Sequence, residues 1–241
     1  MIERTEQELT SLWPRTTGAF WLGCILASIA SFVIWSKLVR LGDAAVTAAN
    51  ILQNETLFRL GFVADLASGA FYVGVTALLF YLLRPVSRSG SLLAAFFGMY
   101  GIAIGGVGLV GRAIALVLLH GDPALSAFTT AQLQAAALIT LRVQSQVFPI
   151  GMVFFGLQCA IVGYLITRSG YIPKALGILL ALGGASYLLS SFATFMDPQL
   201  GARLGPFIMP VAVLGEGALT LWLLFKGVDS RQTLQRTASA A

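Results

Sequence analysis

The sequence SLLAAFFGMYGIAIGGVGLVGRAIALVLL, residues 91 to 119, decides the fold because it runs for 29 residues with a single charge, Arg112. A helix rises about 1.5 Å per residue, so about 20 apolar residues are enough to cross the hydrocarbon core of a bilayer. This segment is therefore expected to span a membrane. Five further stretches meet the same test, and the expected spans are 17–39, 57–83, 91–119, 147–167, 174–196 and 206–226.

Composition also places the chain in a lipid bilayer. Hydrophobic residues make up 57% of the 241 residues and charged residues 10%, whereas a soluble domain carries roughly 25% charged residues. The expected fold class is an all-α, polytopic membrane helix bundle, with short cytoplasmic turns and longer outer connections. We expect a single transmembrane domain over residues 1–241, which ends in a polar, flexible tail at 227–241.

Lysine and arginine predict the orientation. With six spans, the side that holds the two termini carries nine of these residues in its loops, tails and span ends, and the opposite side carries four, while Arg59 and Arg112 count as within spans. Positive residues are retained on the cytoplasmic side during insertion. Both termini are therefore expected in the cytoplasm, with the chain in the bacterial inner (plasma) membrane. The net charge of +5 is dispersed over loops and tails, which excludes the basic stripe of a nucleic-acid-binding surface.

The sequence contains few residues that could bind a metal ion or a cofactor. The one histidine, His120, follows the third span, and the two cysteines, Cys24 and Cys159, lie inside apolar stretches. These residues cannot assemble a multi-histidine or zinc site, so we expect no metal and no cofactor. The sequence also lacks the motifs of serine hydrolases, zinc proteases and P-loop NTPases.

The two longest outer connections, 40–56 and 120–146, are long enough to hold structure of their own. The second mixes glutamines with alanines and leucines, a pattern that fits either a helix on the membrane surface or an outward extension of the fourth span. We prefer the surface helix. Asp122-Pro123 and Asp197-Pro198 each follow a long span, as expected where proline stops a helix.

The third span contains residues 106–111 in the pattern G-x-G-x-x-G, which also occurs in dinucleotide-binding turns. That fingerprint works only between a strand and the start of a helix, and here it lies inside an apolar span. Close helix packing explains it better, because small residues let neighbouring backbones approach. The glycines that recur at three- and four-residue spacing are Gly98, Gly101, Gly105, Gly108 and Gly111.

Ionisable residues inside the spans are the main candidates for function, because a charge at bilayer depth costs at least about 2.5–3.5 kcal/mol unless it is paired or hydrated. From the helical rise, Asp65 and Arg112 lie about 12 Å and about 10 Å below the outer ends of their spans, and Glu216 lies about 15 Å into the sixth span. These three side chains can share one layer. Arg59 is one helical turn from Glu55 and is expected to pair with it.

Two interpretations of these charges remain open. The two carboxylates within the spans and the two guanidiniums sum to zero, which a buried polar cluster needs. They form either a polar pocket that opens to the outer side, with Arg112 bridging Asp65 and Glu216, or an ion-pair network that only fixes helix packing. The ligand-binding residues predicted for the pocket are Arg59, Asp65, Tyr72, Arg112, Gln158, Tyr187, Ser190 and Glu216.

Three segments carry a family resemblance. They are NETLFRLGFVADLASG at 54–69, GYLITRSGYIPKALGILLALGGASYLLSSF at 163–192 and GEGALTLWLLFKGV at 215–228. The chain resembles the bacterial membrane proteins of the domain of unknown function 4386 family across spans two to six. The resemblance implies a multi-pass membrane protein, and it brings no activity, substrate or functional residue with it.

Three classes of function fit these features. A binding or transport protein would hold a small anionic or amphipathic ligand, such as a lipid headgroup, at Arg112 and exchange a proton at Asp65 or Glu216. A structural or regulatory subunit would bind a membrane-protein partner or a second copy through its glycine faces. An intramembrane enzyme would use two carboxylates as acid and base, but no recognised nucleophile accompanies them, so we lean away from enzyme activity.

Overall fold

The computed structural model describes residues 2–228 and is helical throughout that range apart from short turns. Six of its helices are long and apolar enough to cross a membrane, which confirms the predicted multi-pass bundle. The tail predicted at 227–241 lies outside the described residues from 229 onward. The elements are α1 (Ile2–Leu38), α2 (Ala44–Gln53), α3 (Glu55–Leu83), α4 (Arg88–His120), the 3-10 turn η1 (Pro123–Leu125), α5 (Thr130–Ser169), α6 (Lys174–Met196) and α7 (Pro198–Phe225).

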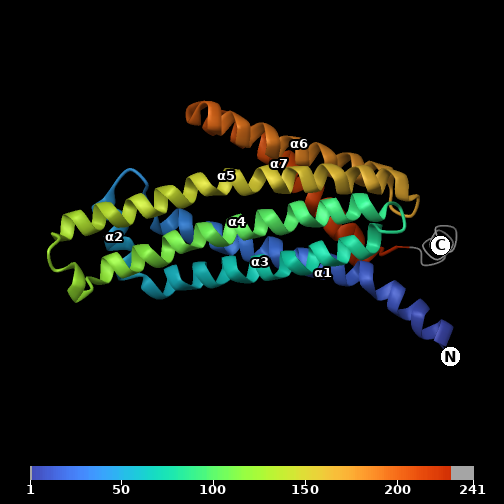
Figure 1. The fold of residues 1–241 in the computed structure, drawn as a ribbon, viewed down its shortest axis with the longest axis horizontal. Helices are drawn as coiled ribbons and strands as arrows, with labels where there is room; N and C mark the ends of the chain where they lie inside the picture. Colours follow the sequence, from blue (N-terminus) through green and yellow to red (C-terminus); the bar gives the residue numbers. More distant parts are fainter. Residues whose placement is uncertain (1, 229–241) are drawn as a thin grey trace. The chain divides into compact units, whose positions relative to one another are not determined.

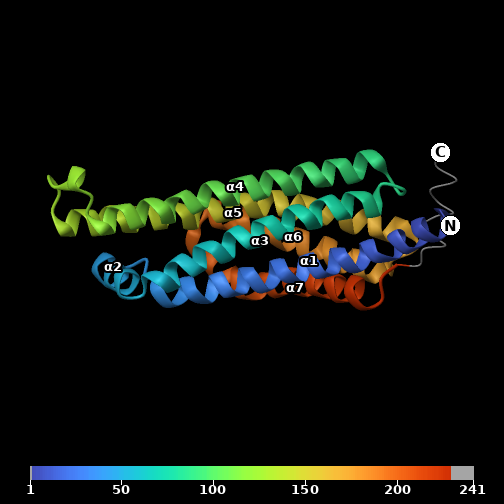
Figure 2. The same cartoon turned by 90° about the horizontal axis from the view of Figure 1, so that it is seen from below.

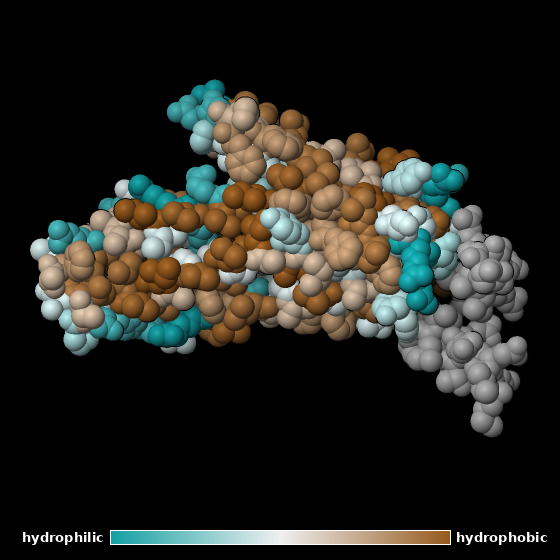
Figure 3. Space-filling view, in the orientation of Figure 1, coloured by the Kyte–Doolittle hydropathy of each residue, from teal (hydrophilic) through white to brown (hydrophobic). Residues whose placement is uncertain are grey.

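The outer surfaces of the long helices are apolar. Figure 3 shows hydrophobic side chains over much of the visible face. Large side chains such as Met196, Phe207 and Phe225 are more than two thirds exposed. A water-soluble protein rarely leaves so much contiguous apolar surface uncovered, whereas lipid solvates it.

The described helices group into two compact units. Unit 1 contains 2–23, 71–102 and 149–228, and unit 2 contains 24–70 and 103–148. Helices α1, α3, α4 and α5 each contribute a segment to both units, while α6 and α7 belong to unit 1 and α2 to unit 2. The single transmembrane domain predicted above stays a prediction, and each unit is described by itself.

Unit 1 is built on close contact between helix backbones. Helices α6 and α7 pack along each other as a hairpin (Figure 1), and a Cβ added at Gly183 would lie 3.0 Å from the Cα of Ala212. Helices α5 and α6 approach equally closely, since a Cβ at Gly184 would lie 2.5 Å from the carbonyl oxygen of Gly156. Such contacts bring large dispersion energy, which is the main attraction between helices in lipid.

Unit 2 has its own hydrophobic core at the end where α1 stops and α3 begins (Figure 2). The short helix α2 fills the connection 40–56, which was expected to hold structure. Its N-terminus is capped by Asp43, whose side chain accepts a hydrogen bond of 3.0 Å from the Val46 amide. The buried residues of this core are Leu38, Val39, Ile51, Phe58, Ala115, Ala137 and Leu141.

The preferred surface helix at 120–146 is wrong, because α5 runs without a break from Thr130 to Ser169 and thus extends the fourth span outward. The extension forms because Ala137 and Leu141 are buried in the core of unit 2. Arg142 fixes it further by donating from Nε to the Leu41 carbonyl oxygen at 2.9 Å. Pro149 lies inside α5 without ending it, which helices that pack in membranes tolerate.

Two local predictions are confirmed. Helix α6 ends at Met196 and α7 begins at Pro198, so Asp197-Pro198 separates two helices. The G-x-G-x-x-G pattern lies inside α4, where a Cβ on Gly111 would meet the Thr140 carbonyl oxygen of α5 at 2.8 Å. Gly111 therefore serves close helix packing, whereas the same prediction is wrong for Gly105, around whose added Cβ there is open space.

Candidate functional site

The eight predicted site residues fall into both units. Arg59, Asp65 and Arg112 belong to unit 2, and Tyr72, Gln158, Tyr187, Ser190 and Glu216 belong to unit 1. The structure therefore places polar arrangements in each unit, and each arrangement has its own geometry. The predicted bridge from Arg112 to Glu216, like the shared layer, stays a prediction.

Asp65 and Arg112 form the central ion pair of unit 2. Nη1 of Arg112 lies 2.7 Å from Oδ2 of Asp65. The arginine side chain is 8% exposed, whereas the aspartate side chain is 26% exposed. One partner is thus buried in protein while the other keeps access to its surroundings.

Three further side chains complete the shell around Arg112. Ser31 accepts a hydrogen bond from Nη1 and Gln144 accepts one from Nε, each at 3.3 Å. The guanidinium carbon also lies 4.8 Å from the centre of the Trp35 ring, within the range of a cation–π contact. Gly61 of α3 lies beside this shell: a Cβ there would be in ordinary contact with Nη1 at 3.7 Å and in tight contact with Cγ2 of Ile34 of α1 at 3.0 Å.

Sequence reasoning missed these three partners of Arg112. Trp35 fits an interface anchor by position, and Gln144 fits a polar surface segment. One signal was available, because Cys24, Ser28, Ser31 and Trp35 repeat at the three- and four-residue spacing that defines one face of a helix.

That face of α1 meets α3 through small polar groups beyond the ion pair. The hydroxyls of Ser28 and Ser68 lie 2.7 Å apart, and the Cys24 sulfur lies 3.3 Å from the Ser68 hydroxyl. Ser68 follows Asp65 by three residues and therefore shares its face. A row of polar atoms thus continues from Asp65 along the α1–α3 contact.

Glu216 is held in unit 1 by neutral donors. Tyr187 donates its hydroxyl to Oε1 at 2.8 Å, and the Trp21 indole donates to Oε2 at a longer 3.4 Å. Within the described part of unit 1, no lysine, arginine or histidine forms an ion pair with Glu216. Trp21 is itself 1% exposed, so the carboxyl group meets a packed aromatic neighbour.

A second polar group of unit 1 joins three helices. Tyr72 of α3 donates to Oε1 of Gln158 of α5 at 3.0 Å, and Nε2 of Gln158 donates to the Thr76 hydroxyl at 3.3 Å. Gln158 is 2% exposed and also fills the space beside Gly98 of α4. The gap that it borders has no room for a water molecule, so these groups act as buried packing contacts. Ser190 of α6 is buried as well.

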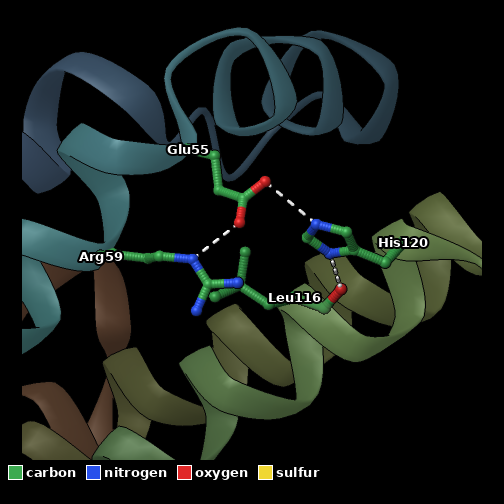
Figure 4. A network of polar contacts seen from close by, with 4 residues as sticks. All are labelled: Glu55, Arg59, Leu116 and His120. Atoms are coloured by element: carbon green, nitrogen blue, oxygen red, sulfur yellow. Dashed lines mark hydrogen bonds and ion pairs between the residues drawn. The ribbon is translucent and has the colours of Figure 1, made fainter.

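Arg59 pairs with Glu55 as predicted, and the pair belongs to a larger network. Nε of Arg59 lies 2.7 Å from Oε1 of Glu55, while Oε2 of the same carboxylate lies 3.0 Å from Nε2 of His120 (Figure 4). The other ring nitrogen of His120 lies 2.8 Å from the Leu116 carbonyl oxygen. The network joins the first turn of α3 to the last turn of α4.

None of these arrangements, which all lie in the described part of the chain, resembles a metal site. Among residues 2–228, no three side chains of histidine, cysteine, aspartate or glutamate come together in a way that could hold a metal ion. The chemistry that the polar groups of unit 2 can carry out is proton uptake and anion binding. The Asp65–Arg112 pair offers one group that takes up a proton and one group that binds an anion.

Comparisons with known proteins agree with the resemblance noted in the sequence. A family model described as "Domain of unknown function (DUF4386)" matches residues 16–227. An uncharacterised protein of Archaeoglobus fulgidus is 27% identical over 155 residues, which cover 64% of this chain and 76% of that protein. No solved structure matches the chain.

Proposed function

The chain belongs to the family described as "Domain of unknown function (DUF4386)", and from that premise we propose that this multi-pass membrane protein binds and transports a small anion together with a proton. In the proposal, Asp65 accepts the proton and Arg112 binds the anion. The ligand is a small anionic or amphipathic molecule with a carboxylate or phosphate group, which matches the planar donor fork of a guanidinium.

The observation that carries the proposal is the ion pair between a buried cation and a partly exposed carboxylate. A guanidinium at this depth needs an anionic partner, because a charge left alone in lipid is costly. Asp65 supplies that partner when it is ionised. When Asp65 takes up a proton, the pair loses its negative charge, and an external anion restores it.

Charge balance couples the two binding events. The empty state contains Asp65 as carboxylate and Arg112 as guanidinium, and the loaded state contains a neutral Asp65, the guanidinium and the bound anion. Both states have zero net charge, so neither leaves an unpaired charge in the membrane. Removing one partner of a buried pair costs about 3–5 kcal/mol. Because Asp65 is 26% exposed, we expect the lower end, which corresponds to a roughly 100-fold coupling between proton and anion.

Partial exposure of Asp65 supports a path for the ligand. The small polar side chains of Ser28 and Ser68 extend from the aspartate along the α1–α3 contact, and Ser28 is exposed. Hydroxyl groups can replace part of the hydration shell of an anion. The Trp35 ring, 4.8 Å from the guanidinium carbon, adds a contact that does not occupy a hydrogen-bond donor.

A second candidate function has its own observation. Arg112 already has three polar partners and an aromatic neighbour, which is also what a purely structural clamp between helices needs. In that case the protein is a membrane subunit whose charges only fix helix packing. It would bind a membrane-protein partner or a second copy through other surfaces.

The experiment that separates the two functions uses Asp65→Asn, because asparagine resembles a permanently neutral aspartate. Binding of acetate and octanoate to purified protein is measured by calorimetry, with Arg203→Gln as a control that removes an exposed guanidinium away from the predicted site. The transport proposal expects Asp65→Asn to bind an anion more tightly and Arg112→Gln to lose binding. A stable Asp65→Asn protein that binds neither anion would reject it.

Orientation is proposed from the charge distribution. Nine basic residues against four favour cytoplasmic termini in the inner membrane. Reporter fusions at the C-terminus and within 120–130 test this proposal. Opposite signals from the two sites, with the C-terminus on the cytoplasmic side, are expected, and the reverse pattern would overturn it.

A further inference from the structure

Both ring nitrogens of His120 face oxygen atoms that only accept hydrogen bonds. Nδ1 lies 2.8 Å from the Leu116 carbonyl oxygen, and Nε2 lies 3.0 Å from Oε2 of Glu55. A neutral imidazole has one N–H and can satisfy one of these two contacts, whereas the imidazolium has two and satisfies both. The geometry therefore fits a protonated ring (Figure 4).

We propose that His120 is a proton-binding site that ties the end of α4 to the start of α3 when protonated and loosens the following segment, 121–129, when it loses the proton. This site is independent of the transport proposed at Arg112. Glu55 is the first residue of α3 and His120 the last of α4, outside the apolar stretches 57–83 and 91–119.

The charged groups around the ring favour the imidazolium. The hydrogen bond to the Leu116 carbonyl and the carboxylate of Glu55 both raise the pKa of His120 above its ordinary value of 6.5, and the nearby guanidinium of Arg59 opposes them weakly. The position at the C-terminal end of α4 also favours a cation. Asp122, two residues further on, has its side chain turned to the Ala124 amide, from which it accepts a hydrogen bond.

The sign of the pH effect follows from these shifts. Because the pKa of His120 is raised in the folded protein, its stabilising contribution is complete below about pH 6.5 and is lost as the pH rises through the raised value. Hydrogen bonds from Arg59 and His120 lower the pKa of Glu55 from its ordinary 4.5, although burial opposes this effect. The carboxylate is therefore ionised throughout the range in which the histidine titrates.

The segment that the tie controls lines a groove. The groove has a volume of about 390 Å³ and lies between α4 residues, including Ile114 and Val117, and the turn that holds Ala124 and Leu125. That turn begins at Pro123, three residues after His120. Loosening the end of α4 would move one wall of the groove relative to the other.

His120 is the one histidine of the chain, so its titration can be followed without assignment. The protein is labelled with isotopic histidine, reconstituted in lipid nanodiscs, and titrated by NMR as wild type, Glu55→Gln and Asp122→Asn. Amide hydrogen exchange of 121–129 is then compared between wild type and His120→Gln at about pH 5.5 and about pH 8, on either side of the ordinary histidine pKa.

We expect a higher titration midpoint in the wild type than in Glu55→Gln, and a wild-type midpoint in Asp122→Asn, which removes a nearby charge without touching the contact. We also expect 121–129 to be better protected in the wild type than in His120→Gln at the lower pH only. A His120 titration midpoint in Glu55→Gln equal to that of the wild type would overturn the proposed contact between protonated His120 and Glu55. A difference in protection that is the same at both pH values would overturn the loosening.

Discussion

Arg112 is held between a carboxylate and an aromatic ring: Nη1 lies 2.7 Å from Oδ2 of Asp65, and the guanidinium carbon lies 4.8 Å from the centre of the Trp35 ring. The pair joins α3 to α4, and Trp35 adds α1 to the contact. Gln144 brings in α5 as the acceptor of a hydrogen bond from Nε, so four helices of unit 2 meet at one cation. Substitutions of Arg112 should change the stability of unit 2. Under the proposed function they should also change the affinity for an anion that takes the place of the Asp65 carboxylate.

The ion pair should show strong coupling in a double-mutant cycle. Arg112→Gln alone leaves a carboxylate without its cation, and Asp65→Asn alone leaves the reverse, so each should lower stability by about 3 kcal/mol, the lower end of the range for a buried pair because Asp65 is 26% exposed. The double variant should be more stable than the sum of the two losses predicts. Thermal unfolding in detergent measures all four proteins, and additive losses would show that the two side chains do not interact.

Glycine contacts of α5 and α6 should be sensitive to a single methyl group. Gly184→Ala places a Cβ 2.5 Å from the Gly156 carbonyl oxygen, which forces the helices apart at a cost of about 1–3 kcal/mol. Gly105→Ala is the matched control, because no atom lies within 4 Å of its added Cβ. Equal unfolding temperatures of the two variants would contradict the close packing.

Tyr187 should stabilise Glu216 through its hydroxyl. Tyr187→Phe removes a hydrogen bond of 2.8 Å and keeps the ring, so the expected loss is about 1.5–3 kcal/mol if the carboxyl group is ionised and about 1 kcal/mol if it is neutral. Glu216→Gln provides the reference, because the amide cannot ionise. Comparing Tyr187→Phe in both backgrounds by thermal unfolding distinguishes the two states. The same large loss in the glutamine background would mean that ionisation plays no part.

Ser31 tests whether the neighbours of Arg112 matter for its orientation. Ser31→Ala removes an acceptor at 3.3 Å and should reduce stability by about 0.5–1.5 kcal/mol. It should also weaken acetate binding less than Arg112→Gln does, because the cation remains. Calorimetry with both variants checks the order, and a complete loss of binding in Ser31→Ala would assign the serine a direct role.

The pattern of apolar residues predicted the positions of the helices along the chain well. It predicted the contacts between side chains of different helices less well. Six long apolar runs give six long helices because length and hydropathy alone decide whether a segment spans a bilayer. The i,i+4 pair of Glu55 and Arg59 was predictable because both residues lie on one helix. The contact between Arg112 and Gln144 was not, because it depends on which helices are neighbours, and sequence spacing carries no such information.

The error at 120–146 has the same origin. Gln132 and Gln144 give this segment the mixed polarity of a surface helix, and a sequence shows polarity without showing what it faces. In the structure Leu141 is fully buried against the core of unit 2, so the apolar face of the segment meets protein. Because of these tertiary contacts, residues from Thr130 onward form the outer part of α5 instead of a separate helix on the membrane surface.

The measurement that tests the account most directly is the affinity of the wild type and of Asp65→Asn for octanoate and acetate as a function of pH. We predict that the wild type binds an anion more tightly as the pH falls, whereas Asp65→Asn binds it with a roughly 100-fold higher affinity than the wild type at neutral pH and with little dependence on pH. The double variant Asp65→Asn/Arg112→Gln, which lacks the guanidinium, should bind neither anion. Affinities that respond to neither pH nor Asp65→Asn would contradict the coupling of proton and anion, and the ion pair would then be a structural clamp.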